Sequence, residues 1–367
     1  MTTTLRLKPI RSDIEKAADI IAGGGLVAFP TETVYGLGAN ALDPEAVANI
    51  YKVKGRPSDN PTIVHIEDEE ALSWLATGIT PAVHKLIDRF WPGPMTIIVN
   101  RTKIVPDVTT GGLDTVGIRM PENKVAHELI RLSGCPIAAP SANISGKPSP
   151  TMAYHVLQDM EGCIEAVIDG GSCSVGIEST IIDLTGDTPI ILRPGIITHE
   201  EISEVLGEKV MLDPALNQVP SGGSIRPKAP GMKYKHYAPN AEMIIFAPEN
   251  YLDGREAERF IRKTTSERQQ IKALLMNALH EERNAREKKG QKVFILETGK
   301  YDRRDTARNI FAQLREADKM NADVILTVAL PQCGIGFSIM NRLLKSAGFN
   351  LRYVKTERLL YDNSDGK

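Results

Sequence analysis

Residues 26–41 read LVAFPTETVYGLGANA, and this stretch decides the class of fold. Its first four residues form an apolar run that is typical of a buried strand, and Pro30 ends the run. Two threonines and a glutamate follow, and then Gly36 and Gly38. A tight turn held by bonds from side chains to the backbone explains this order of residues, and so does a cradle for a small polar ligand. The stretch therefore predicts a buried strand that leads into a polar loop.

Strand-like and helix-like segments alternate on both sides of this stretch, which is typical of an α/β fold. Capping residues indicate three helix starts: Ser12 with Glu15, Asp43 before a proline, and Thr198 with Glu201. Apolar runs predict strands at residues 5–7, 26–30, 62–66, 95–99, 116–120, 136–139, 164–168, 179–183, 243–246, 292–297 and 322–329. Further helices are expected at residues 123–133, 265–288, 305–319 and 338–347.

Pro, Gly, Ser and Lys become frequent over residues 217–239, where no apolar period is present. This composition indicates a linker, because such a segment has little to bury. We therefore predict a first domain at 1–208, an interdomain linker at 209–240 and a smaller α/β domain at 241–367. Within the smaller domain, the loop at 334–336 is either a turn from strand to helix or a loop that faces a ligand of its own.

The chain has 367 residues and a formal net charge of −2, with 42% hydrophobic and 25% charged residues. This composition is that of an ordinary globular protein, and it disfavours a protein that coats nucleic acid through its overall charge. None of the four cysteines forms a C-x-x-C pair, and scattered cysteines suit a reducing compartment. No apolar run is long enough for a signal peptide or a membrane span. We expect a cytoplasmic protein that makes no use of a membrane.

Common sequence motifs of catalysis are absent, including G-x-x-x-x-G-K-[ST], G-x-S-x-G and H-E-x-x-H. The segment from Gly36 to Ala41 resembles the G-x-G-x-x-A of dinucleotide-binding folds. However, a six-residue loop separates it from the strand, and no helix start follows in the required place. The pattern therefore gives only weak support to a nicotinamide cofactor.

Four cations lie near strand or helix ends of this nearly neutral chain: Lys54, Arg56, Arg119 and Arg193. The dipole at a helix end explains Lys54, but a lysine and an arginine two residues apart also suit phosphate oxygens. Arg119 lies in a strand-like run, where a guanidinium needs an anionic partner from the protein or from a ligand. Because loops at strand ends converge in an α/β sheet, we expect a site for a phosphorylated small molecule, with Mg²⁺ held by the phosphates.

Polar side chains that can accompany these cations lie in neighbouring segments. Ser141 and Asn143 follow an apolar strand, and two residues apart in an extended chain they point to the same side. An Asx or Ser turn is the alternative interpretation of this pair. His65 lies inside an apolar strand, where a histidine that serves only in the core is the more usual case.

Taken together, these segments closely match the motifs of one family. The matching segments are PTETVYGLGANA at 30–41, Lys54-x-Arg56, DNPTIVH at 59–65, Ser141-x-Asn143, GIEST at 176–180 and LRPG at 192–195. In this order and spacing they resemble the Sua5/YrdC/YciO family. PGMKYKHYAP at 230–239 and GIGF at 334–337 are similar to its two-domain Sua5 branch rather than to its single-domain YrdC branch. The resemblance implies a twisted mixed sheet with helices, a linker that acts as a lid, and a smaller Rossmann-like α/β domain.

The resemblance implies an L-threonylcarbamoyladenylate synthase, a nucleotidyltransferase that condenses L-threonine, bicarbonate and ATP and releases diphosphate. The product would pass to a separate transferase complex that forms N6-threonylcarbamoyladenosine at position 37 of tRNA. Mg²⁺ would enter with ATP, so no residue of the chain is expected to ligate a metal.

The site residues below are implied by the same resemblance. Lys54 and Arg56 carry the catalytic, phosphate-binding role. The further ATP-binding positions are Asn60, Thr115, Ser141, Asn143, Ser149, Arg193, Tyr234, His236 and Tyr237. The threonine-binding positions are Thr31, Thr33, His65, Arg119, Ala139 and Ser179. The sequence leaves open which of the first two threonines makes the contact.

Two other classes of function fit parts of the sequence. An RNA-binding module would also use a basic site, and the small net charge counts only modestly against weak binding of RNA. A carbamoyl transferase of the hydrogenase-maturation type carries a related domain, but it also has cysteine clusters that this sequence lacks. No activated serine or cysteine pattern is present, so we expect catalysis by positioning and charge neutralisation.

Overall fold

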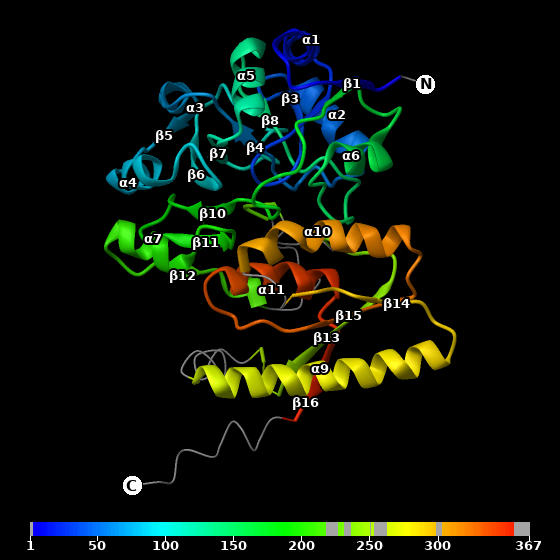
Figure 1. Ribbon diagram of the computed structural model, residues 1–367. Helices are drawn as coiled ribbons and strands as arrows, with labels where there is room; N and C mark the ends of the chain where they lie inside the picture. Colours follow the sequence, from blue (N-terminus) through cyan, green and yellow to red (C-terminus); the bar gives the residue numbers. More distant parts are fainter. Residues whose placement is uncertain are drawn as a thin grey trace. The chain divides into compact units, whose positions relative to one another are not determined.

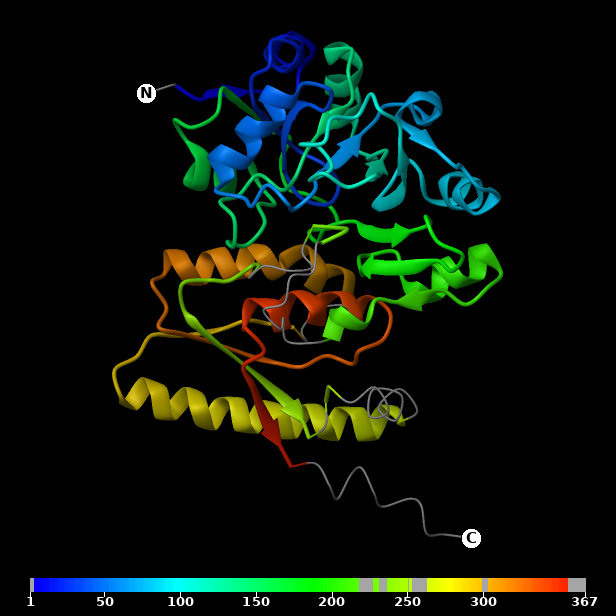
Figure 2. The same ribbon diagram turned by 180° about the vertical axis from the view of Figure 1, so that it is seen from behind.

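The computed structural model describes residues 3–217, 227–230, 236–249, 251–252, 263–298 and 303–355 (Figures 1 and 2). The chain divides into two compact units, Met1–Tyr234 and Lys235–Lys367. An α/β fold with a larger first part and a smaller second part is therefore confirmed. The domain limits at 208 and 241 stay a prediction, and the first unit includes most of the chain that we assigned to the linker.

The first unit is built on one mixed sheet. Its strands are β1 (Leu5–Leu7), β2 (Val27–Phe29), β3 (Gly36–Asn40), β4 (Ile63–His65), β5 (Ala76–Thr77), β6 (Met95–Arg101), β7 (Thr115–Arg119), β8 (Ile137–Ala138), β9 (Ala166–Ile168), β10 (Thr180–Asp183), β11 (Ile190–Arg193) and β12 (Met211–Leu212). They follow the order β1-β9-β2-β3-β8-β4-β7-β6-β10-β11-β12, and β5 pairs with β6. Parallel pairs such as β4 with β7 and antiparallel pairs such as β6 with β7 both occur. The expected mixed sheet is confirmed, and each apolar run of this part of the sequence contains a strand.

Helices pack on both faces of this sheet. They are α1 (Arg11–Ala22), α2 (Pro44–Lys54), α3 (Leu72–Leu75), α4 (Pro81–Phe90), α5 (Lys124–Ser133), α6 (Ala153–Met160) and α7 (His199–Leu206). Helices α1 and α5 lie side by side (Figure 1), and with Val27 and Phe29 they form one core. Ala28 between them points into a second core with the other helices. Successive side chains of β2 therefore enter different cores, one on each face of the sheet. Because both faces are covered, the whole run is apolar.

Two of the three expected helix caps are confirmed. The Asp43 carboxylate accepts the backbone N–H groups of Glu45 and Ala46, and Thr198 forms a capping box with Glu201. The third was wrong: α1 begins at Arg11, and its N-cap residue makes no side-chain cap. The Asp13 carboxylate accepts the backbone N–H of Lys8 at 3.0 Å instead, so an acidic side chain one position later holds the start of this helix.

The glycines of the quoted stretch form strand β3 and not a nucleotide-binding loop. A Cβ atom on Gly38 would lie 2.8 Å from the ring of Phe29 and 2.8 Å from the side chain of Ile137. Gly38 therefore allows its neighbours to pack directly on the backbone, and the resemblance to a dinucleotide-binding motif has a structural explanation.

The second unit contains a parallel sheet in the order β14-β15-β13-β16. Its strands are β13 (Glu242–Pro248), β14 (Val293–Ile295), β15 (Val324–Val328) and β16 (Leu351–Val354), and its helices are α9 (Thr265–Lys288), α10 (Arg303–Lys319) and α11 (Ile335–Ser346). Helix α9 covers one face of the sheet, and α10 and α11 cover the other (Figure 1). This arrangement confirms the Rossmann-like prediction.

Part of the predicted linker packs within the first unit. Ala229 is fully buried in a cluster with Ile63, Ile98, Ile181 and Leu192. Beside it, the ammonium of Lys228 lies 3.0 Å from a carboxylate oxygen of the buried Asp183. Residues 218–226 and 231–235 of the linker, including the predicted Tyr234, lie outside the described residues. Among described helices, none has the length and apolar character needed to cross a membrane.

Candidate functional site

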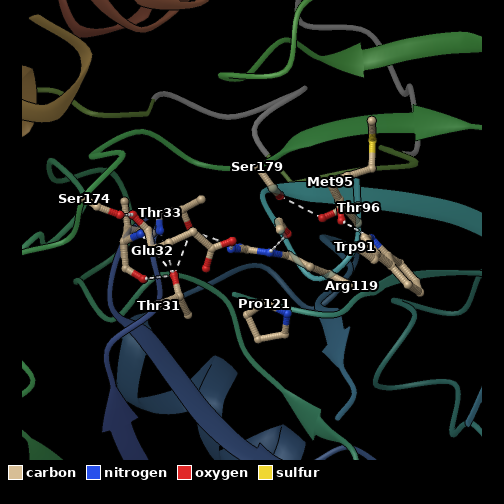
Figure 3. Close-up of polar contacts among 12 residues, drawn as sticks. Thr31, Glu32, Thr33, Trp91, Met95, Thr96, Arg119, Pro121, Ser174 and Ser179 are labelled. Atoms are coloured by element: carbon tan, nitrogen blue, oxygen red, sulfur yellow. Dashed lines mark hydrogen bonds and ion pairs between the residues drawn. The ribbon is translucent and has the colours of Figure 1, made fainter. Parts of the chain in front are cut away.

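Arg119, the last residue of β7, is the centre of a buried polar group that we call the Arg119 cluster: Thr31, Glu32, Thr33 and Arg119 (Figure 3). Its side chain is 4% exposed, and its Nη2 lies 2.5 Å from Oε1 of Glu32, which is 5% exposed. Nη1 donates to the hydroxyl of Thr33 at 2.9 Å, and Nε donates to the carbonyl oxygen of Gly93 at 3.2 Å. The anionic partner that a strand arginine requires is therefore Glu32, which the sequence analysis did not assign to the site.

The two threonines of this loop have different roles. The Thr31 hydroxyl donates to the carbonyl oxygen of Val34 at 2.7 Å and accepts the backbone N–H of Thr33 at 3.1 Å. Because its one proton is used, the 2.8 Å contact between the two hydroxyls has Thr33 as donor. Thr31 therefore builds the turn, whereas Thr33 holds Arg119 and keeps one oxygen lone pair for a further donor.

Ser179 and Arg193 form a second group beside the first. The Ser179 hydroxyl is 2.7 Å from that of Thr96, and Arg193 donates to it at 3.1 Å and to the Ser179 carbonyl at 3.0 Å. The carbonyl oxygens of Gly93 and Pro94 bind Arg119 and the backbone of Thr180, so adjacent residues of one loop join the two groups. Figure 3 shows Arg119 between the Thr31–Thr33 loop and the Ser179–Thr96 pair.

His65 stands directly beside Arg119, since β4 and β7 pair these two residues. Its ring is edge-on to Phe29, and Nδ1 lies 3.2 Å from the carbonyl oxygen of Ile63. Burial, together with the positive charge of Arg119, lowers the pKa of His65 to about 3. The imidazole is therefore neutral at pH 7 and can bind a ligand only as a neutral donor or acceptor. The predicted Ala139 is adjacent, because its backbone N–H donates to the same Ile63 oxygen at 2.9 Å.

Lys54 and the Ser141–Asn143 loop form the Lys54 cluster: Lys54, Arg56, Ser141 and Asn143. Lys54 is only 2% exposed, and its ammonium donates to the carbonyl oxygens of Ser141 and Asn143, each at 2.5 Å. The Ser141 hydroxyl donates to Oδ1 of Asn143 at 2.5 Å. The lysine and the Ser-x-Asn pair are therefore in direct contact, although Lys54 ends helix α2 and does not lie in a loop.

Arg56 and Asn60 belong to the loop that follows α2. Arg56 donates to the carbonyl oxygens of Asn60 at 3.1 Å and Pro61 at 2.7 Å. Asn60 is 1% exposed, and among the described residues its Oδ1 has no hydrogen-bond partner. A buried amide oxygen without a donor is costly in a folded protein, so Asn60 can accept from a ligand. The loop is thus held in shape while one acceptor stays available.

Residues 26–41, the stretch quoted at the start, connect the Arg119 cluster to the Lys54 cluster. Gly36 pairs with Ser141 in an isolated bridge, and the backbone N–H of Ala142 donates to the carbonyl oxygen of Tyr35 at 2.8 Å. Thr33 and Ser141 therefore lie on neighbouring segments of the first unit. The first unit brings the predicted threonine-binding and phosphate-binding residues to one group of loops.

The other described residues of the prediction lie at three places: Ser149 beside the same loops, Thr115 at the far end of β7, and His236 and Tyr237 in the second unit. The buried Ser149 donates to Oε1 of Glu178 at 2.6 Å, a carboxylate that the sequence analysis did not single out. Thr115 lies at the opposite end of β7 from Arg119, about 13 Å along the strand. Tyr237 belongs to the second unit, where its ring packs 5.1 Å from that of Phe311, and His236 lies beside it.

The residues missed from the sequence are buried acids and backbone oxygens. Glu32 gave a signal, because it is the one carboxylate in a loop of hydroxyls that follows a buried strand. Glu178 lies in the matched segment at 176–180 but was not singled out, and the carbonyl oxygen of Gly93 gave no signal, because hydrogen bonds between distant residues leave no local pattern. Across the described part of the chain, no group of three His, Cys, Asp or Glu residues can hold a metal ion.

Comparison with known proteins matches both units. The Sua5/YciO/YrdC family model, described as "Telomere recombination", matches residues 19–195. A model described as "Threonylcarbamoyl-AMP synthase, C-terminal domain" matches residues 197–348.

Similar full-length proteins agree with these matches. A threonylcarbamoyl-AMP synthase of Pyrococcus abyssi is 46% identical, over 92% of this chain and 95% of its own length. One from Bacillus subtilis is 43% identical, over 91% of this chain and 93% of its own length. The crystal structure of Pyrococcus abyssi Sua5 complexed with L-threonine has a TM-score of 0.80 and 44% identity, and it covers 96% of this chain and 99% of that one. The chain therefore belongs to the Sua5/YciO/YrdC family, in its two-domain Sua5 form.

Proposed function

We propose that this chain is an L-threonylcarbamoyladenylate synthase, a nucleotidyltransferase that makes its product from L-threonine, bicarbonate and ATP. The observation that carries the proposal is the similarity of more than nine-tenths of the chain to proteins named threonylcarbamoyl-AMP synthase. A relative with 44% identity has been solved with L-threonine bound. The product would serve formation of N6-threonylcarbamoyladenosine in tRNA by a separate transferase complex in the cytoplasm.

In this proposal the Arg119 cluster binds L-threonine. The buried Arg119–Glu32 pair offers one positive and one negative group, which suits a zwitterionic amino acid. The second carboxylate oxygen of Glu32 has no hydrogen-bond partner in the described chain, and Thr33 keeps an acceptor lone pair. Both can accept from the substrate ammonium, which favours Thr33 over Thr31 as the contact. His65, Ala139 and Ser179 complete the set.

The Lys54 cluster would bind the triphosphate of ATP. Lys54 and Arg56 supply positive charge, and Ser141 and Asn143 supply polar groups on the loop that Lys54 holds. The other nucleotide positions proposed are Asn60, Thr115, Ser149, Arg193, Tyr234, His236 and Tyr237. When bound with ATP, Mg²⁺ would neutralise phosphate charge, and the phosphates would supply its ligands.

The chemistry follows from these roles. The threonine ammonium first gives up a proton. The free amine then attacks carbon dioxide, with loss of a second proton from nitrogen, or attacks bicarbonate, with loss of water, and either route forms a carbamate. A carbamate oxygen then attacks the α-phosphorus of ATP, and the bond to the β-phosphate breaks with diphosphate as the leaving group. The chain contributes no covalent nucleophile, so its residues act by holding the two substrates in line and by neutralising charge. Because a carbamate loses carbon dioxide in water, the linker is proposed to close over the site.

The test is diphosphate release from ATP and Mg²⁺ by the purified full-length chain. Release is expected only when both L-threonine and bicarbonate are present. Release without them, or with another amino acid, would keep a site for adenylyl transfer but reject the threonine assignment. A folded sample that releases no diphosphate would favour the RNA-binding alternative, whose signature is binding that ignores ATP and falls steeply with salt.

A further inference from the structure

A cavity of about 190 Å³ lies in the first unit at the carboxyl end of β4, and we call it the α3–α5 cavity. Its wall is made by the chain that follows β4, by α3 and by the last turn of α5. Ile66 on this wall belongs to one core of the unit and Ile130 to the other. The cavity therefore lies at the end of the sheet where the two cores stop, and every residue of its lining is described.

Hydrogen bonds hold the wall of this cavity in place. A carboxylate oxygen of Asp68 accepts the backbone N–H of Ala71 at 3.2 Å, which fixes the turn before α3. The hydroxyl of Thr102, directly after β6, donates to the carbonyl oxygen of Trp74 at 2.7 Å. Pro136 on the opposite side precedes β8, which pairs with β4. The cavity is therefore a built feature of the sheet end.

The lining carries an excess of negative charge. It includes the carboxylates of Glu67, Asp68 and Glu70, and within the described chain none of the three forms an ion pair. The cation of the lining, Arg131, donates to both carboxylate oxygens of Glu128 on its own helix, at 2.6 and 3.1 Å. Burial and the charge of Asp68 raise the pKa of Glu67. The last turn of α5 adds the negative end of a helix dipole.

The cavity also has an aromatic wall. Trp74 lines it, and this side chain is 39% exposed, whereas the other tryptophan of the chain, Trp91, is 8% exposed. The face of an indole ring attracts a cation more strongly than other aromatic rings do, and aromatic rings are the usual means of recognising a quaternary ammonium group. A cavity of about 150 Å³ is enough for benzene, so this one has room for an ammonium group with several methyl substituents.

We propose that the α3–α5 cavity binds a small organic cation, an ammonium group that carries apolar substituents. The ring of Trp74 contacts the substituents, and the carboxylates of Glu67 and Glu70 balance the charge. No residue of the Arg119 or Lys54 cluster lines the cavity. Its acids also disfavour the carboxylate of L-threonine and the phosphates of ATP. The site therefore takes a ligand that is not a substrate of the proposed reaction.

The test follows the indole N–H signals of the ¹⁵N-labelled full-length chain by NMR. The probes are choline and 3,3-dimethylbutan-1-ol, which has the same shape but carbon in place of the charged nitrogen. Choline should shift the Trp74 signal saturably and leave that of Trp91, whose indole N–H donates to the carbonyl oxygen of Met95 at 2.8 Å. The neutral probe should bind at least tenfold more weakly. Saturating L-threonine should leave the affinity for choline unchanged.

Variants assign the binding to this wall, with saturation transfer to the choline methyl protons as the readout. Glu67→Gln combined with Glu70→Gln should weaken choline binding at least tenfold, and Trp74→Leu at least fivefold. The matched control is Glu200→Gln with Glu204→Gln, two exposed acids one turn apart on α7, which should change the affinity less than twofold.

The comparison of the two probes uses the unaltered chain, so it decides the matter even where a variant fails to fold. Equal binding of the two probes would overturn the proposal, as would insensitivity to loss of the Glu67 and Glu70 charges. Displacement of choline by L-threonine would also overturn it, because it would place the probe in the Arg119 cluster.

Discussion

Glu32→Gln is the most informative single substitution in the first unit, because it removes one charge of a buried pair and keeps its shape. The pair is 2.5 Å apart and no more than 5% exposed, so solvent screens it little. Coulomb's law with an effective dielectric constant of about 20 gives about 7 kcal/mol for this separation. The amide oxygen of glutamine still places a partial negative charge beside Arg119, so part of that attraction remains. Removal of one partner of a buried pair usually costs about 3–5 kcal/mol, and we expect a loss near 3 kcal/mol.

The assay is urea unfolding of the full-length chain, followed by a signal from the first unit such as tryptophan fluorescence. Glu161→Gln is the matched control, because Glu161 pairs with Arg6 at 2.7 Å but both side chains are more than half exposed. An exposed pair contributes at most about 1 kcal/mol. The difference between the two variants therefore isolates the effect of burial.

Enzyme kinetics supply a second readout of Glu32→Gln. Loss of the acceptor for the substrate ammonium should raise the KM for L-threonine at least tenfold while the KM for ATP changes less than threefold. A free energy of unfolding within 1 kcal/mol of that of Glu161→Gln would refute the reasoning about the buried pair. An unchanged KM for L-threonine would refute the role of Glu32 in binding.

Four further predictions follow from the same geometry. Thr33→Val should raise the KM for L-threonine about tenfold, whereas Thr31→Val should mainly lower the free energy of unfolding; equal KM values in steady-state kinetics would contradict the division of roles. Lys54→Met should abolish diphosphate release and also lower the melting temperature, because two buried carbonyl oxygens lose their donor; retention of a tenth of the rate would reject the phosphate role. In the folded chain the pKa of His65 is about 3, below its unfolded value of about 6.5, so its contribution to stability is complete above pH 6.5 and is lost as the pH falls toward 3. His65→Gln should therefore make the free energy of unfolding, measured with urea, depend less on pH between 6 and 4, by about 1.4 kcal/mol per pH unit. Gly38→Ala should lower the free energy of unfolding by about 1–3 kcal/mol, since the added Cβ would meet two side chains at 2.8 Å. An unchanged urea midpoint would contradict this expectation and would show that these side chains can move.

Local patterns in the sequence predict the elements of this fold well. Apolar runs locate strands such as β2 and β4, and the capping residues Asp43 and Thr198 locate the starts of α2 and α7. They fail where a distant neighbour decides the local structure. Strand β3 has too many glycines for a strand pattern, because the ring of Phe29 occupies the space that its side chains would need. The Ser12 cap fails for a local reason instead: the helix begins one residue before Ser12, at Arg11, and the Asp13 carboxylate binds the backbone N–H of Lys8.

In the candidate site, too, some residues can be predicted from the sequence, whereas their partners are known only from the fold. Arg119 could be singled out because a guanidinium in a strand is expensive to bury, and that argument requires an anion without naming it. The structure supplies Glu32 from a loop 87 positions away, at 2.5 Å. The contact between Lys54 and the Ser141–Asn143 loop likewise joins segments that only the fold brings together. Sequence reasoning therefore finds the charged residue, and the fold determines its partner.

The charges of the two clusters correspond to the charges of the two proposed substrates. L-Threonine is a zwitterion, and the Arg119 cluster has one guanidinium and one carboxylate with no net charge. A site with Arg119 alone would bind any small carboxylate, whereas Glu32 makes it disfavour anions that lack an ammonium. ATP is a polyanion, and the Lys54 cluster has two cations and no acid. The two clusters meet at Gly36 and Ser141, so the neutral site proposed for the amino acid lies next to the positive site proposed for the phosphates. In the proposed function, such an arrangement would let each substrate select its own place by charge and would bring the threonine amine toward the α-phosphate, where the carbamate must react.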